Sequence, residues 1–110
     1  MAFKLTVSDT VTVPVKGSIA NASGVFQPFS FELICARLPA DELHKAATEG
    51  TVGEVMDRVV KGWNHVTDDD GAAVPFSPEN LAAAFNVVGI VGIAFAAYLE
   101  ACGAKGKEKN

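Results

Sequence analysis

Charge is scarce in this chain of 110 residues, and histidine, cysteine and tryptophan are scarcer still. Charged residues make up 20% of the sequence and hydrophobic residues 49%, with two histidines, two cysteines and one tryptophan. The net charge of -4 makes the chain a poor nucleic-acid binder, because its basic residues gather only at the C-terminus. The apolar content is too high for a disordered chain, and the length fits one domain.

The few residues that usually carry chemistry are not arranged for it. Cys35 and Cys102 are too far apart for a metal knuckle or a disulfide framework, and we expect both to be small buried hydrophobes in a reducing compartment. His44 and His65 have no partner at metal-ligand spacing, and the aspartates at 68–70 do not match a calcium loop. We therefore expect no catalytic site, no metal and no cofactor, so that the protein is not an enzyme.

The N-terminal third alternates between apolar and polar residues, which is typical of strands with one buried face. Apolar residues occupy odd positions from Phe3 to Val15, and a second alternating run covers residues 29–35. Residues 21–24 form a turn cluster between the two runs. Pro14 places the first strand at a sheet edge or interrupts it. The sequence predicts an antiparallel β-hairpin or small meander within a β-rich segment, residues 3–36.

The pattern then changes to helical spacing. A proline followed by acidic residues opens a short helix that should end at Gly50. Thr51 and Glu54 form a capping box for a second helix, for which Gly62 is the expected stop. The apolar stripe of this second helix consists of Val52, Val55, Met56, Val59 and Val60.

An Asp-Gly turn at residues 68–71 separates these helices from the C-terminal part. Ser77, followed by proline, is a good N-cap for a further helix that should end at Gly103. Asn86 and Gly89 can split this helix into two. We thus expect an α+β fold, with three to four helices over residues 39–103. A single domain should cover residues 1–104, and residues 105–110 should be a flexible basic tail.

Residues 80–99 carry no charge at all, although the chain is otherwise ordinary and acidic. A run of 20 such residues matches the length of a membrane span. The capping at Ser77, the many alanines and Asn86 favour a soluble helix or helix pair instead, with apolar surface left over for a partner or for self-association. Trp63 is either a core anchor or an interface anchor. The candidate partner-binding residues are Trp63, Phe76, Leu81, Phe85, Val88, Val91, Phe95 and Tyr98.

A block of the sequence resembles the small tail assembly chaperones of long-tailed bacteriophages. In this block, Gly-Trp-Asn-His-Val at 62–66 precedes the acidic turn at 68–71. Val-Pro-Phe-Ser at 74–77 and Glu-Asn-Leu at 79–81 then begin the apolar helix. The C-terminal end, with Lys105 and a final Lys-Asn, is similar as well.

The resemblance implies a protein that binds the tape measure protein, keeps it soluble and supports tail tube assembly around it. It also implies a homo-oligomer in the host bacterial cytoplasm that is absent from the mature virion, with the tail tube protein as a further partner. The alternatives are a minor structural protein of the tail and, less favoured, a small membrane protein. Neither the resemblance nor the composition indicates a nucleic-acid or membrane partner.

Overall fold

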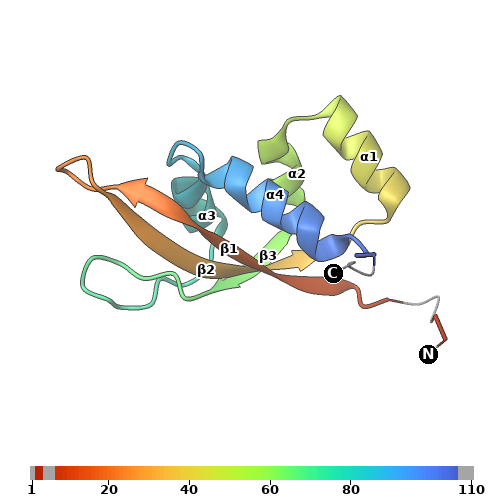
Figure 1. Ribbon diagram of the computed structural model, residues 1–110, viewed down its shortest axis with the longest axis horizontal. Coiled ribbons are helices and arrows are strands. Elements are labelled where there is room, and N and C mark those ends of the chain that lie inside the picture. Colours follow the sequence, from red (N-terminus) through yellow and green to blue (C-terminus); the bar gives the residue numbers. More distant parts are fainter. Residues whose placement is uncertain (1, 4–6, 107–110) are drawn as a thin grey trace.

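A three-stranded antiparallel sheet and four helices make up the part of the chain that the computed structural model describes, residues 2–3 and 7–106 (Figure 1). Along the chain, two strands are followed by two helices, a third strand and two more helices. They are β1 (Thr10–Ala20), β2 (Phe26–Ala36), α1 (Ala40–Glu49), α2 (Val52–Val59), β3 (Val60–Asn64), α3 (Pro78–Phe85) and α4 (Ile90–Cys102). The α+β fold expected from the sequence is confirmed.

The sheet has the order β1-β2-β3, and the helices cover one of its faces (Figure 1). Val13 pairs with Leu33, which pairs in turn with Trp63, so these three inward-facing side chains form one row. Thr12 and Pro14 alternate with buried valines and are exposed on the other face. β1 is an edge strand, which explains why it tolerates proline.

The core lies between the sheet and the helices, with α4 packed across β1. Its buried members are Val13, Val15, Leu33, Cys35, Met56, Val59, Val60, Leu81, Ala94 and Tyr98. Cys35 is a buried hydrophobe as expected, but Cys102 is only half-buried because it ends α4 at the margin of the core.

β3 corrects the expectation that residues 39–103 are helical apart from turns. α2 ends at Val59 rather than at Gly62, and Val60 belongs to β3, where it pairs with Cys35. Residues 60–64 form a strand rather than a further helical turn because β2 offers them backbone hydrogen-bond partners while Val60 remains buried. Consecutive β-branched valines also favour extended backbone over helix.

The first strand begins later than the alternation predicts. Phe3 and Val7 lie outside any strand, and Leu5 lies outside the described residues. β1 starts at Thr10 because its partner β2 ends at Ala36, the residue opposite Thr10. Of the predicted tail at 105–110, only residues 105–106 are described, and the Lys105 ammonium lies 3.1 Å from the Glu100 carboxylate.

The predicted caps and the predicted helix break are present. The hydroxyls of Thr51 and Ser77 each accept a hydrogen bond from the backbone N–H three residues later. α3 ends at Phe85, and Gly89, with φ of 94°, begins α4 in a left-handed conformation. Among the described residues no one helix has both the length and the apolarity to span a bilayer; α3 and α4 have them only jointly, across a 105° bend.

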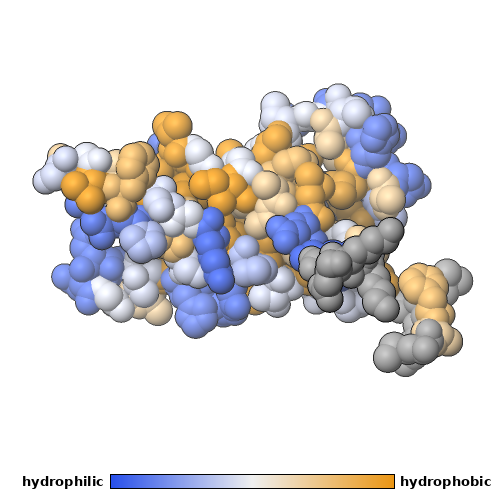
Figure 2. Space-filling model, in the orientation of Figure 1, coloured by the Kyte–Doolittle hydropathy of each residue, from blue (hydrophilic) through white to orange (hydrophobic). Residues whose placement is uncertain are grey.

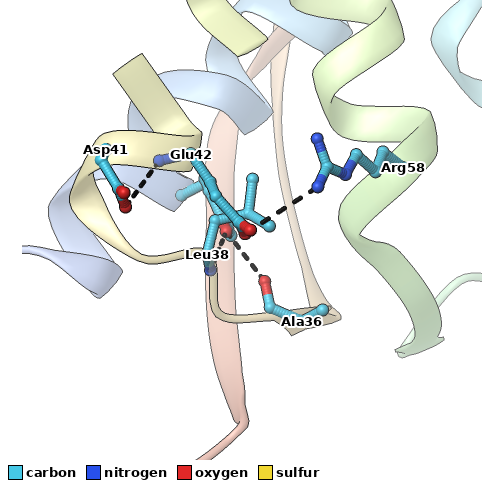
Figure 3. A network of polar contacts seen from close by, with 6 residues as sticks. Ala36, Leu38, Asp41, Glu42 and Arg58 are labelled. Atoms are coloured by element: carbon cyan, nitrogen blue, oxygen red, sulfur yellow. Dashed lines mark hydrogen bonds and ion pairs between the residues drawn. The ribbon is translucent and has the colours of Figure 1, made fainter. Parts of the chain in front are cut away.

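Tyr98 fastens α4 to the junction between β2 and α1. Its buried hydroxyl donates to the carbonyl of Ala36 at 2.8 Å and accepts from the N–H of Leu38 at 3.2 Å. Burial raises the pKa of Tyr98 to about 12, although the hydrogen bond from Leu38 acts in the opposite direction. Figure 3 shows this junction beside the exposed ion pair of Glu42 and Arg58, whose charged groups are 3.9 Å apart.

Candidate functional site

The eight residues predicted to bind a partner do not all reach the surface. Leu81 and Tyr98 are buried in the core, so their assignment to a partner surface is corrected. The inner face of a three-stranded sheet needs covering, and α3 and α4 use these side chains to cover it. Val88 is fully exposed at the corner between α3 and α4. The other five are half-buried and pack against the core: Trp63, Phe76, Phe85, Val91 and Phe95.

Trp63 holds the segment that follows β3 in place. Its indole Nε1 donates to the carbonyl of Val74 at 2.8 Å, and its ring meets Phe76 edge-to-face with centroids 5.3 Å apart. Between these contacts the chain forms a narrow loop, whose two sides are joined by the isolated β-bridge between Thr67 and Ala73. The carboxylate of Asp68 accepts two backbone N–H groups within it, at 2.9 and 3.0 Å. We call residues 65–74 the acidic arm.

The tip of the hairpin exposes apolar side chains that the sequence reasoning missed. Ile19, Val25 and Phe26 are exposed at the end of β1 and β2, and Phe26 keeps 70% of its surface accessible. Val87 and Val88 are exposed at the corner between α3 and α4. Figure 2 shows apolar side chains along the hairpin and over the helices above it. The sequence signal that could have indicated this exposed tip is the apolar pair Val25 and Phe26, directly after the turn glycine, Gly24.

An open groove of about 400 Å³ lies between the hairpin, the acidic arm and the corner of α3 and α4. We call it the tip groove. Its apolar lining comes from all three parts and includes Ile19, Phe29, Phe31, Val66, Val87 and Ile90. His65 also lines it, with a φ of 67° that turns the chain from β3 into the acidic arm.

Unequal strand lengths create this groove. β1 and β2 have 11 residues each, whereas β3 has five and pairs only with residues 32–35 of β2. The distal half of the hairpin therefore extends past β3, and its inner face is left incompletely covered. There Phe29 and Phe31 stack with centroids 6.0 Å apart. The ring of Phe29 lies so close to Gly17 that a Cβ at this position would come within 2.8 Å of it.

The formal charges within the three segments that line the tip groove have one sign. The hairpin from 18 to 31 and the corner from 84 to 90 contain no charged residue. The acidic arm contains Asp68, Asp69 and Asp70 and neither lysine nor arginine. Just outside the groove, Glu32 accepts a hydrogen bond from the side-chain amide of Asn64 at 3.3 Å. The walls are thus apolar, and the formal charges within the three segments are negative, while Lys16 lies just outside them, opposite Ser30.

A larger hollow of about 730 Å³ lies between β1 and α4, but it is built differently. Its lining consists mainly of small side chains such as Ala96, Ala97 and Ala101, with the ion pair of Glu100 and Lys105 at its margin. Large apolar and aromatic side chains mark interaction surfaces better than alanines do, which favours the tip groove as the candidate site.

The described residues contain no cluster of three or more His, Cys, Asp or Glu that could hold a metal ion. The lining of the tip groove can bury apolar surface of a partner, and the acidic arm that supplies one of its walls carries negative charge. Comparisons of the chain with protein-family models, with curated proteins and with solved structures gave no match.

Proposed function

We propose that this protein is a tail assembly chaperone of a long-tailed bacteriophage, which binds the tape measure protein and supports tail tube assembly without catalysis. The observation that carries the proposal is the tip groove, an uncovered apolar surface between three chain segments. An exposed surface of this kind is typical of proteins that bind other proteins.

The sequence block that resembles such chaperones is a second, separate support for the proposal. Trp63, Phe76 and Ser77 of this block hold the acidic arm and the start of α3 in place. His65 and Val66 of this block line the tip groove, and most of the rest of its lining comes from the hairpin and from residues 84–90. The block that carries the resemblance thus builds one part of the candidate site.

The proposed mechanism is shielding of apolar helix surface. A long helical chain with an exposed apolar stripe aggregates, and cover by many small acidic subunits keeps it dispersed until tube subunits replace them. We further propose that the protein forms homo-oligomers in the host bacterial cytoplasm, contacts the tail tube protein during the exchange, and is absent from the mature virion.

Co-expression with the tape measure protein encoded beside this chain tests the proposal. We expect a larger soluble fraction of the tape measure protein and a complex of the two in size-exclusion chromatography. Ile19→Ser, at a position that lines the tip groove, should weaken the complex, whereas Val52→Ser, an exposed apolar position on α2, should leave it unchanged. A tape measure protein that stays insoluble and forms no complex would refute the proposal.

A minor structural protein of the tail is the alternative, because a permanent tail contact would also use an exposed apolar surface. Mass spectrometry of purified particles separates the two functions. A chaperone should be missing from finished virions, whereas a structural component should be present in a fixed number of copies.

A further inference from the structure

We infer that the tip groove binds an amphipathic helix whose apolar stripe is flanked by lysine or arginine. The inference goes beyond the proposed function in naming the surface and the chemistry of the segment bound there. It rests on the proposed function in one respect, that the partner is a helical protein.

The shape and lining of the groove favour a helix. Its walls come from a hairpin, an arm and a helix corner, and its volume of about 400 Å³ suits a few large side chains rather than a whole domain. Amphipathic helices insert such side chains at every third or fourth position. The Phe29 and Phe31 rings and the side chains of Ile19 and Val87 would contact them.

The negative charge of the acidic arm favours basic residues beside the apolar stripe of that helix. Every charged residue in the three segments that form the groove is an aspartate of the acidic arm. Asp69 and Asp70 are exposed, and Asp68 is fixed by its hydrogen bonds to the backbone of the arm. Basic residues beside the apolar stripe would meet these carboxylates, whereas acidic ones would be repelled.

The same charge disfavours a second copy of this chain as the occupant. In a two-fold symmetric contact through the groove, the acidic arms of both copies would approach the same interface. Neither the hairpin tip nor the corner offers a lysine or arginine to compensate them. A heterologous partner with basic flanks avoids this repulsion.

Two synthetic peptides test the inference with the whole protein. Both carry leucine at every third or fourth position, and one has lysines and the other glutamates beside this stripe. By fluorescence anisotropy at low salt, we expect the lysine peptide to bind about tenfold more tightly than the glutamate peptide. The preference should shrink as the salt concentration rises.

Charge reversal on the acidic arm is the decisive variant. D69K/D70K should invert the preference, so that the glutamate peptide binds more tightly. The matched control E49K/D57K makes the same change of net charge with exposed acids of α1 and α2 and should keep the preference for lysine. If both double variants change the preference between the two peptides equally, the preference depends on net charge alone, and the inference is overturned.

Apolar contact is tested separately. Ile19→Ser and Val87→Ser should each weaken binding of the lysine peptide several-fold, because both side chains line the groove. Val52→Ser and Leu99→Ser are controls of similar exposure, 38% and 41% against 42% and 39%, and should have no effect. Circular dichroism verifies the fold of each variant, and equal affinities of all four for the peptide overturn the inference.

The outcomes separate this inference from the proposed function. If the tape measure protein forms a complex that D69K/D70K and Ile19→Ser do not weaken, the function stands and the groove is not its site. If the lysine peptide binds as described but the tape measure protein does not, the inference stands and the proposed function fails. If analytical ultracentrifugation shows an oligomer that Ile19→Ser dissociates, a second copy occupies the groove and the inference is wrong.

Discussion

The two ends of the hairpin differ in how they are covered. Where β2 leads into α1, Tyr98 of α4 binds the backbone on both sides of Arg37, and the Arg37 side chain donates to the carbonyl of Cys102. At the other end of β2, 11 residues away, Phe26 and Val25 face solvent. We call these regions the Tyr98 end and the tip end. One end bonds these polar groups inside the protein, apart from the buried Arg37 Nε, which has no partner among the described residues, and the other end leaves apolar side chains exposed.

The difference shows what a small domain does with limited side-chain volume. A chain of this size buries only about 60–70% of the surface that it exposes when unfolded, so one region of the sheet remains less covered than the rest. α4 spans the distance from the corner at Gly89 to the Tyr98 end, where its polar contacts are concentrated. The polar contacts and the exposed apolar side chains thus lie at opposite ends of the same two strands.

Alkaline pH should weaken the Tyr98 end most strongly. Burial raises the pKa of the Cys35 thiol from 9.0 to about 12 and that of the Tyr98 hydroxyl from 10.0 to about 12. The unfolded chain loses these protons at lower pH than the folded protein does, so the free energy of unfolding should fall as the pH rises from about 9 to about 12. The tip, residues 19–27, has no titratable side chain.

Urea denaturation across this pH range measures the effect. Cys35→Ala removes the thiol, so its free energy of unfolding should fall less steeply between pH 9 and 10 than that of the wild type. Parallel curves for the two proteins would show that the buried thiol does not contribute.

Replacing Tyr98 with phenylalanine should lower the free energy of unfolding by about 2 kcal/mol. The variant leaves the carbonyl of Ala36 and the N–H of Leu38 without their partner in a partly buried junction. Urea denaturation at neutral pH checks this value. A loss below about 0.5 kcal/mol, the range of ordinary surface substitutions, would mean that water replaces the hydroxyl and that the Tyr98 end is less closed than described.

Gly89, at the corner between α3 and α4, and Gly92, within α4, should respond in opposite directions to alanine. Gly89→Ala should lower the free energy of unfolding by about 1–2 kcal/mol, because its φ of 94° strains an L-residue. Gly92→Ala should raise it by about 0.5–1 kcal/mol, since it lies within α4 with open space around its Cβ position. Thermal unfolding of both variants compares them, and a stabilised Gly89→Ala would indicate that α3 and α4 prefer to join.

The local signals in the sequence predicted most of the fold. The alternation of residues 29–35 predicted β2, the hydroxyls of Thr51 and Ser77 predicted two helix starts, and the pair Asn86 and Gly89 predicted the break. Each of these signals depends on neighbours within a few residues. The third strand depends instead on pairing between segments about 30 residues apart, which no local pattern contains.

The candidate site was harder to predict for the same reason. Leu81 and Tyr98 belong to an apolar run, but composition does not show which side of a helix meets the sheet. Val88 was predicted to bind a partner. It is fully exposed because it lies in the corner between α3 and α4, outside both helices. Phe26 is exposed because it pairs with Ala20 at the end of the hairpin and faces away from Phe29 and the helices, a property of the assembled sheet rather than of the sequence around it.

Phe26→Ser should change stability least and the surface most. Since Phe26 keeps 70% of its surface exposed, we expect the free energy of unfolding to stay within about 0.5 kcal/mol of the wild type. A hydrophobic dye that fluoresces on apolar surfaces should nevertheless bind less, because the largest exposed side chain of the tip is gone. Val52→Ser, a smaller and less exposed apolar position on α2, should leave dye binding unchanged. A destabilisation above about 1 kcal/mol would instead make Phe26 part of the packed structure, and the tip end would then be as closed as the Tyr98 end.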